Sequence, residues 1–434
     1  MEPISFVGPM FIIMIILILL KTPVAYAILA SNMIFLLTSG LKPLTLVSVR
    51  MVAGLNSFPL LAVPLFILAG NLMDKGGISK RLIVWAENLV GWMPGGTGVV
   101  AIVSSTIFAA LTGSGPATVA AIGSIMIPSL ITKDYTVEQS AGMVAAAGAL
   151  GPIIPPSIPM IIYGVTMSLS IPDMFIAGIL PGLFIAGLLI IVNMVIAYKN
   201  PKILNHRNDY SFNFRRFLRT TLEASGALLM PIIILGGIYG GIFTPTEAAS
   251  IGVVYGLFVG IFIYREIKIK ELPKVLISSM ETSAMVNIII AAAALLSWII
   301  ASTHTSSVMV SFLTMFVHNK LMYLLILNIT LFIVGALIDT VAAIIIVAPV
   351  LVPIGIELGV DPLHLGVLFV INLVIGYVTP PFGYNLFTAC SVTGLKFDRI
   401  LKGVVPYLLV EIFAVLILTY IPGIITWLPS ILAK

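Results

Sequence analysis

Long apolar runs, separated by short polar segments or by Gly and Pro breaks, follow one another along the whole chain. A helix needs about 20 apolar residues to cross the roughly 30 Å hydrocarbon core of a membrane. We therefore expect an all-α polytopic membrane protein. The runs predict ten full crossings, near residues 4–20, 22–41, 57–73, 136–163, 174–198, 222–240, 245–264, 275–303, 362–389 and 404–428.

Two further apolar stretches, 97–130 and 322–356, are each interrupted by a polar tip. The first tip is Thr112-Gly-Ser-Gly-Pro-Ala-Thr118, and the second is Gly335-Ala-Leu-Ile-Asp-Thr340. Each arm beside a tip has about 12–16 apolar residues, too few to span a bilayer comfortably. We predict two re-entrant hairpins, because irregular backbone at membrane depth is tolerated only where protein or a cavity satisfies it.

Composition supports the membrane assignment. Of the 434 residues, 60% are hydrophobic and only 9% are charged, and the mean hydropathy is +1.18. Soluble globular proteins carry roughly 25% charged residues, so soluble enzymes and nucleic-acid-binding proteins are excluded. The single cysteine, Cys390, excludes an intramolecular disulfide and a cysteine metal cluster. The sequence has no nucleotide-binding loop or zinc-protease motif, so we expect a protein that is not an enzyme.

Positive charge is distributed unevenly between the two faces of the predicted bundle. If the N-terminus lies outside, the outer face holds only four of the 22 Lys and Arg residues, namely Lys42, Arg50, Lys320 and Lys434. Cytoplasmic segments are enriched in Lys and Arg, so this predicts an N-terminus and a segment 304–320 outside the cytoplasm and a cytoplasmic basic linker helix, 199–221. Converting either hairpin into two crossings would remove the asymmetry.

Three other segments are predicted to have structural roles. Segments 74–93 and 265–274 mix charged and apolar residues, which fits either amphipathic arms at the membrane surface or solvated loops. Thr244-Pro-Thr-Glu247 has the pattern of a helix start, with Thr244 as the N-cap and Glu247 at the third helical position. We interpret that motif as a cap.

The two halves of the chain repeat each other. Pro155-Pro156 corresponds to Pro380-Pro381, and Thr118-Val-Ala-Ala-Ile122 recurs as Thr340-Val-Ala-Ala-Ile344. Each half contains five crossings and one hairpin, and an odd number of crossings places the second half upside down. Inverted repeats with interrupted helices are typical of secondary transporters.

This pattern divides the chain into three parts. They are a first repeat, 1–198, with a hairpin near 97–130 and a broken helix near 136–163; the linker, 199–221; and a second repeat, 222–434, with a hairpin near 322–356 and a broken helix near 362–389.

The tips and breaks place polar groups at membrane depth. The prolines of Gly151–Pro159 and Gly376–Gly383 prevent a continuous helix and leave carbonyl oxygens free. These carbonyls and the tip hydroxyls suit a small hard cation such as Na⁺, while half-helix N-termini suit an anion. Asp339 is the clearest acid at membrane depth, where it could hold Na⁺, carry a proton or pair with a cation. The structural alternative is an N-cap on the helix that begins at Thr340.

At these residues the sequence resembles the large membrane (M) subunit of tripartite ATP-independent periplasmic (TRAP) transporters. The matching stretches are Phe58–Phe66, Thr112–Thr118, Gly151–Pro159, Gly241–Ala249, Asp339-Thr340 and Thr379–Gly383. The resemblance implies an elevator-type carrier in the bacterial inner membrane, driven by two or more transported Na⁺ ions. It also implies a small four-helix (Q-type) membrane subunit and a periplasmic (P-type) binding protein that delivers an organic acid. Because no four extra spans precede Pro23 or follow Leu428, we expect the small subunit to be a separate chain.

Carried over by position, the resemblance places two Na⁺ sites and a substrate site between them. The first Na⁺ site would use Thr112, Gly113, Ser114, Gly115, Thr118, Gly151, Pro152 and Pro155. The second would use Gly335, Leu337, Asp339, Thr340, Thr379, Pro381 and Gly383. The substrate would contact Ser114, Pro116, Ser157, Asp339 and Asn385. Glu281-Thr282 is a further polar pair that could line a cavity.

Two questions stay open at this stage. The alternative to a tripartite system is a self-sufficient carrier or antiporter that uses Asp339 for protons. The acid could be a C4-dicarboxylate, sialic acid, a sugar acid or a keto acid. No Arg or Lys lies at predicted membrane depth, so carboxylate recognition would depend on helix ends, hydroxyls and bound Na⁺.

Overall fold

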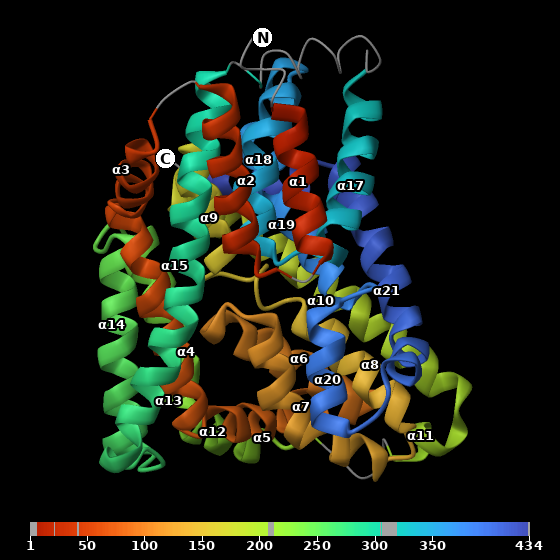
Figure 1. Cartoon of the computed structure of the whole chain (residues 1–434). Coiled ribbons are helices and arrows are strands. Elements are labelled where there is room, and N and C mark those ends of the chain that lie inside the picture. The colour runs from red at the N-terminus through yellow and green to blue at the C-terminus, as the bar shows by residue number, and fades with distance from the viewer. Residues whose placement is uncertain are drawn as a thin grey trace.

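The computed structural model describes residues 7–20, 22–40, 43–206, 212–303, 305 and 319–432. All regular secondary structure within these ranges is helical (Figure 1). Seven segments in this part of the chain are long and apolar enough to cross a membrane, or eight if the bent pair Phe214–Glu223 and Ser225–Tyr239 is one crossing. The prediction of an all-α polytopic membrane protein is confirmed. The N-terminal residues and most of 304–320, predicted to be periplasmic, lie outside the described ranges.

Five helices open the chain: α1 (Val7–Leu19), α2 (Val24–Ser39), α3 (Thr45–Leu55), α4 (Ala62–Lys75) and α5 (Ile78–Val90). A 3-10 turn, Phe58–Leu61, leads into α4, and the two form one candidate span. The helices α1 and α2 have only 13 and 16 residues, fewer than the predicted spans 4–20 and 22–41. Pro23 precedes α2, and Gly40 ends it in the left-handed conformation. The helix α5 occupies most of segment 74–93.

A helical hairpin follows, formed by α6 (Gly96–Thr112) and α7 (Gly115–Ile131). Next come α8 (Val137–Gly148), α9 (Ile158–Met167) and the long α10 (Ile171–Lys199). The predicted crossing 136–163 is interrupted by the non-helical residues 149–157, where the prolines remove backbone donors.

The predicted linker helix, 199–221, is not a single helix. The structure forms α11 (Pro201–Asn205) and α12 (Phe214–Glu223), with residues 207–211 outside the described ranges. Asn200 and Asn213 each cap the helix that follows, so two helices start here rather than one. A bend of 67° separates α12 from α13 (Ser225–Tyr239). The indole Nε1 of Trp85 in α5 donates to Thr221 Oγ1 at 3.0 Å, which ties α12 to α5.

The second half contains α14 (Pro245–Phe258), α15 (Leu272–Ser302), α17 (Lys320–Leu337), α18 (Thr340–Glu357), α19 (Pro362–Ile375), α20 (Tyr384–Thr393), α21 (Phe397–Tyr420) and α22 (Gly423–Leu432). A π turn, Val259–Ile263, extends α14, and 3-10 turns at Ile269–Glu271 and Gly376–Val378 precede α15 and follow α19. The predicted cap is present: Thr244 accepts from Glu247 N, and the Glu247 side chain accepts from Thr244 N. The predicted crossing 362–389 is interrupted between α19 and α20, and 404–428 divides between α21 and α22.

The hairpin arms are longer than predicted. The helices α6 and α7 have 17 residues each, α17 and α18 have 18 each, and the latter two are long and apolar enough to span a membrane. The cause lies at the tips, where only Gly113-Ser114 and Ile338-Asp339 stand outside the helices. Ser114 and Asp339 cap α7 and α18 directly, so no longer loop is needed.

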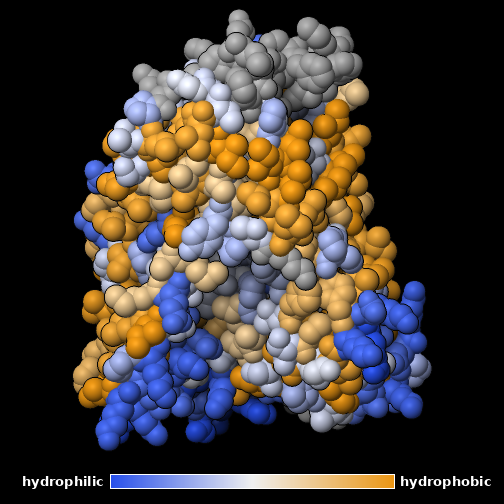
Figure 2. All heavy atoms as spheres, viewed as in Figure 1, coloured by the Kyte–Doolittle hydropathy of each residue, from blue (hydrophilic) through white to orange (hydrophobic). Residues whose placement is uncertain are grey.

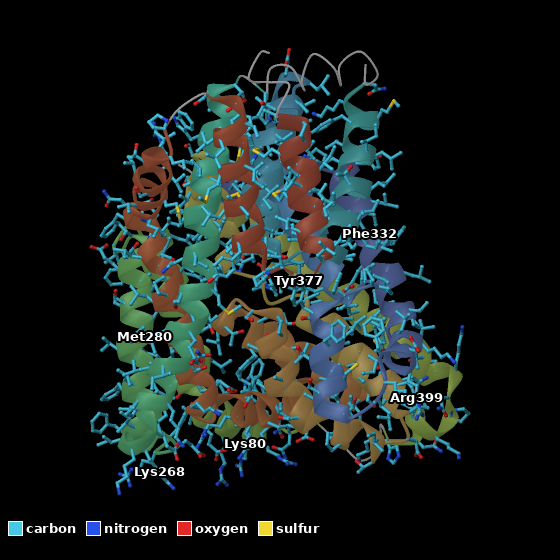
Figure 3. The ribbon with its side chains drawn as sticks, in the orientation of Figure 1. Lys80, Lys268, Met280, Phe332, Tyr377 and Arg399 are labelled. Atoms are coloured by element: carbon cyan, nitrogen blue, oxygen red, sulfur yellow. The ribbon has the colours of Figure 1, made fainter. Side chains whose placement is uncertain are left out.

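The hairpin tips lie in the interior, between two sets of packed helices (Figure 1). One set includes α3, α4, α14 and α15, and the other includes α7, α8, α20 and α21. The helix α6 contacts α4 of the first set and α7 and α8 of the second, so it joins the two sets, while α9 contacts α4 and α18 contacts α15. Lys80, Lys268 and Arg399 lie at one end of the molecule, and Tyr377 lies midway along it (Figure 3). We call this end, coloured as hydrophilic in Figure 2, the basic end.

Candidate functional site

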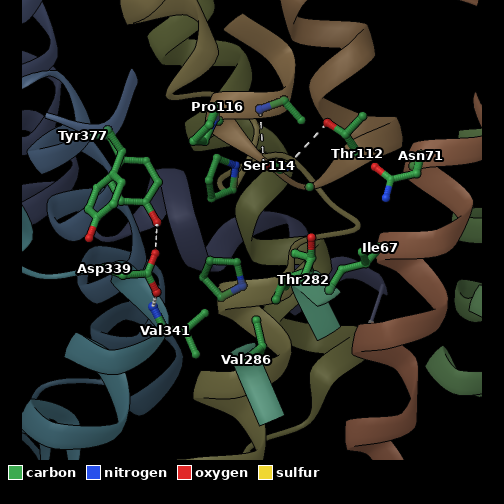
Figure 4. Close-up of a pocket in the computed structure, with 18 residues that line it drawn as sticks. Ile67, Asn71, Thr112, Ser114, Pro116, Thr282, Val286, Asp339, Val341 and Tyr377 are labelled. Carbon is green, nitrogen blue, oxygen red and sulfur yellow. Dashed lines mark hydrogen bonds between the residues drawn. The ribbon is translucent and has the colours of Figure 1, made fainter. Parts of the chain in front are cut away.

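A cavity of about 260 Å³ lies between the two tips and the helices α4 and α15 (Figure 4). We call it the central cavity. Its lining residues are Ile67, Gly70 and Asn71 of α4; Thr112 to Ala117 of the first tip; Pro152 of the first break, 149–157; Ile158 and Pro159 at the start of α9; Thr282 and Val286 of α15; and Asp339, Val341, Tyr377 and Tyr384. Asp339 is the one charged side chain among these described residues.

The first tip is a compact cluster of hydroxyl groups. Gly113 has a φ of 60° at the end of α6, and Ser114 Oγ then accepts from Ala117 N to start α7. Thr118 Oγ1 donates to Ser114 O at 2.8 Å and lies 3.3 Å from Thr112 Oγ1. Both threonine side chains are buried, so their oxygens face protein rather than lipid.

The first break packs directly against the first tip. A Cβ on Gly151 would lie 2.7 Å from the carbonyl carbon of Ser114, so only glycine permits this approach. The hydroxyl of Ser157 caps α9 through Met160 N and also donates to Pro152 O. Asn385, from α20, also lies against the first tip, because a Cβ on Gly115 would be 2.8 Å from the Oδ1 of Asn385. That buried Oδ1 has no hydrogen-bond partner among the described residues, while Nδ2 donates to Ala145 O.

The second tip has a carboxylate where the first has a hydroxyl. Asp339 Oδ2 accepts from Val341 N at 3.0 Å, which is the N-cap of α18, and Oδ1 accepts from the Tyr377 hydroxyl at 2.9 Å. The predicted cap is therefore present, and Tyr377 orients the carboxylate. The buried Thr340 Oγ1 beside it has no partner in the described structure. Gly376 lies so close that a Cβ there would be 2.2 Å from Gly335 C, so the tip rests on the second break.

The structure separates the predicted residues into those that line the central cavity and those behind it. Lining residues are Thr112, Gly113, Ser114, Gly115, Pro116, Pro152 and Asp339. Buried residues that do not line the cavity are Thr118, Gly151, Pro155, Gly335, Thr340, Thr379 and Gly383, whereas Leu337 is half-buried and Pro381 is exposed. Ser157 and Asn385, expected to touch substrate, are buried and do not line the cavity.

Sequence reasoning missed Asn71, Tyr377 and Tyr384, which also line the cavity. Asn71 Nδ2 donates to Ser279 Oγ of α15 at 2.8 Å, and a lone amide inside an apolar helix was an available signal. The two tyrosine rings meet edge to face with centroids 5.3 Å apart. Only folding brings those two residues to the second tip, so no local signal marked them.

The central cavity continues toward the basic end. Two further cavities, of about 350 and 630 Å³, share Asn71 with it, and their other lining residues include Asp74, Lys75, Lys80 and Lys274. We call these two cavities the vestibule. Figure 2 shows this face of the molecule hollowed above the basic end.

The site belongs to a fold that solved structures contain. The crystal structure of the YdaH transporter from Alcanivorax borkumensis matches this chain with a TM-score of 0.62 and 12% sequence identity, covering 86% of this chain and 87% of that one. At that identity the match shows the fold alone.

Curated relatives match more closely in sequence. The isethionate TRAP transporter permease protein DctMQ of Oleidesulfovibrio alaskensis is 39% identical over 403 residues, which cover 93% of this chain and 63% of that protein. The C4-dicarboxylate TRAP transporter large permease protein DctM of Pseudomonas aeruginosa is 40% identical over 373 residues, 86% of each chain. The model of the tripartite ATP-independent periplasmic transporter family, DctM component, matches residues 11–424. The chain therefore belongs to this family and is the large permease component of a TRAP transporter, not an enzyme.

Proposed function

We propose that this permease takes up a small organic acid across the bacterial inner membrane, driven by an inward Na⁺ gradient. The observation that carries the proposal is the central cavity, which has a polar hairpin tip on each of two sides, each tip resting on a broken helix. Such paired discontinuities bind substrate and coupling ion at mid-membrane in secondary transporters.

The oxygen atoms at each tip support Na⁺ as the coupling ion. At the first tip, the hydroxyls of Thr112 and Thr118 lie beside Ser114 O, and Asn385 Oδ1 is buried without a partner. At the second, the carboxylate of Asp339 lies beside the unpartnered Thr340 Oγ1. Neutral oxygens with at most one carboxylate fit a hard, singly charged cation.

An elevator mechanism with inverted repeats is part of the proposal. The hairpins and broken helices would move together as the transport domain, and α4 and α15 would belong to the stationary scaffold. The connection from the central cavity to the vestibule supports a conformation open toward the basic end, which we take as the cytoplasmic side.

The relatives support both the substrate class and the partners. One is named for isethionate and one for C4-dicarboxylates, which are small organic anions. The DctMQ relative, of which this chain spans 63%, supports a Q-type membrane subunit as a partner. A periplasmic binding protein would supply the substrate.

The test is a flux assay in proteoliposomes that contain this chain, the small subunit and an external binding protein, with labelled C4-dicarboxylate and isethionate as probes. We expect uptake of at least one probe under an inward Na⁺ gradient, without ATP or a pH gradient. Uptake in Na⁺-free medium that follows a pH gradient would support proton coupling through Asp339 instead. Robust uptake by this chain alone would support a self-sufficient carrier.

A further inference from the structure

The helix α15 lines three cavities in succession. From its start, Lys274 faces the vestibule, and Thr282 and Val286 face the central cavity. Further along, Ser297 and Trp298 face a third cavity of about 320 Å³. A helix rises 1.5 Å per residue, so Ser297 lies roughly 16 Å beyond Val286, away from the basic end.

The helices α9 and α18 also line the central cavity and the third cavity, one after the other along their lengths. On α9, Pro159 lines the central cavity and Thr166 lines the third. On α18, Val341 lines the central cavity and Ile345 the third. The third cavity therefore lies between the same helices as the central cavity, further from the basic end.

Arg50, from α3, supplies the positive charge of this third cavity, which we call the Arg50 cavity. Its guanidinium carbon lies 5.2 Å from the centre of the Trp298 ring, a cation–π contact. The hydroxyl residues Thr166 and Ser297 line the same space. By contrast, the described residues that line the central cavity include no Lys or Arg.

The Arg50 side chain is half-buried, and part of its guanidinium has no polar partner among the described residues. Its Nε is buried and makes no hydrogen bond to any residue that the structure describes. Among the described residues, no carboxylate lies within ion-pair distance of it. A charge that is partly removed from water gains from an ionic partner, so a half-buried guanidinium beside a cavity is suited to an anionic ligand.

Close helix packing sets the position of Arg50. Gly54, one turn further along α3, also lines the cavity, and a Cβ there would lie 2.1 Å from Ala294 Cβ of α15. This contact holds the Arg50 face of α3 against α15, since residues four apart share one helix face.

We propose that the Arg50 cavity is an anion-binding site that receives the carboxylate or sulfonate group of the substrate on its way from the periplasm to the central cavity. The inference rests on the proposed function and adds a residue to it. A guanidinium presents two parallel N–H donors to such a group, and the hydroxyls of Thr166 and Ser297 can bind the remaining oxygens. Arg50 would thus select anions before the substrate reaches the tips.

A charge-restoration assay tests this role, because Cys390 is the single cysteine of the chain. Arg50→Cys is made in a Cys390→Ser background and reconstituted with the small subunit. External binding protein supplies only the copies whose periplasmic face is outward. We expect uptake to fall at least tenfold, the loss that follows removal of a charged hydrogen-bond partner. Attachment of a membrane-impermeant trimethylammonium methanethiosulfonate reagent should restore part of it, and the sulfonate reagent should not.

Lys320→Cys is the matched control. Lys320 is an exposed cation that lines none of the cavities described above, and its Nζ donates to Gly359 O. Uptake should be unchanged in this variant, before and after either reagent. In a second arm, substrate should slow labelling of Ser297→Cys, which lines the same cavity and keeps Arg50 in place. If anionic phospholipid slows it and substrate does not, the site binds a lipid headgroup and the inference is wrong.

The two reagents are compared on one folded preparation, so a folding defect cannot produce a charge-dependent difference. Arg50→Cys with full uptake, or equal effects of the two reagents, would overturn the inference. Absence of Na⁺-driven uptake in the unmodified protein would instead overturn the proposed function, so the two failures are distinguishable.

Discussion

At the scale of single residues, the two tips begin the following helix with different capping groups, a hydroxyl at Ser114 and a carboxylate at Asp339. Ser114 and Asp339 both start a helix by accepting a backbone N–H, and both line the central cavity. Asp339 adds a negative charge, which the Tyr377 hydroxyl holds in place at 2.9 Å. A carboxylate with both oxygens engaged has little freedom to turn, so in the proposed Na⁺ site Asp339 would act mainly through its charge.

This difference predicts unequal effects of Asp339→Asn and Ser114→Ala. Asparagine also caps helices well, so Asp339→Asn should keep the fold and remove only the charge. We expect it to raise the Na⁺ concentration for half-maximal uptake about tenfold or more, and Ser114→Ala to raise it a few fold. The measurement is initial uptake rate against Na⁺ concentration, with the exposed Ser430→Ala as the control. Unchanged Na⁺ dependence in Asp339→Asn would contradict the second Na⁺ site.

At the scale of elements, glycines allow backbones to touch where helices and breaks meet. A Cβ on Gly403 of α21 would lie 1.8 Å from Glu138 O of α8, and one on Gly142 would lie 2.3 Å from Gly403 C. Arg399, one turn before Gly403, pairs with Glu138 across the same contact. The packing of α8 against α21 therefore positions the first break, which follows α8, against the first tip.

Gly403→Ala should consequently destabilise the protein. The added methyl group meets backbone, which cannot rotate away, and overpacking of this kind costs about 1–3 kcal/mol. Gly187→Ala, in α10, is the matched control, because nothing lies within 4 Å of its added Cβ. We expect a lower thermal midpoint for Gly403→Ala in detergent and an unchanged or slightly higher one for Gly187→Ala. Equal midpoints would show that α21 shifts freely against α8.

At the scale of the whole molecule, three cavity regions follow one another along α15: the vestibule, the central cavity and the Arg50 cavity. The vestibule and the central cavity share the lining residue Asn71, so they adjoin on the side of the basic end. If the basic end is cytoplasmic, this conformation would release substrate into the cell, and the Arg50 cavity would lie on the periplasmic side.

The orientation can be tested by labelling from outside the cell. In a Cys390→Ser background, an impermeant thiol reagent should modify Lys320→Cys and spare Lys268→Cys, since Lys268 lies at the basic end (Figure 3). Both side chains are exposed, so accessibility alone does not separate them. The reverse pattern would contradict the positive-inside assignment and the periplasmic N-terminus.

Local sequence predicted the helices, tips and breaks because their causes are local. Apolar runs make spans, the prolines of 149–157 remove backbone donors, and Ser114, Asp339 and Thr244 cap the helices that follow them. Two predictions were wrong. The hairpin arms are longer than predicted, and the predicted single linker helix, 199–221, is divided into α11 and α12. In both cases a helix begins after a capping residue, and hydropathy alone does not identify that position.

The sequence by itself therefore determined the membrane class, the two polar tips and the family resemblance. Each of these is a pattern of residues that are close together in the chain. Only the tertiary structure decided which side chains share a cavity. It brought Tyr377 to Asp339, moved Asn385 behind the first tip and set Arg50 beside Trp298. Arg50 and Trp298 lie far apart in the chain, and their contact depends on Gly54 packing against Ala294. Packing of this kind depends on the surfaces of two helices together, so it cannot be predicted from the sequence of one chain segment.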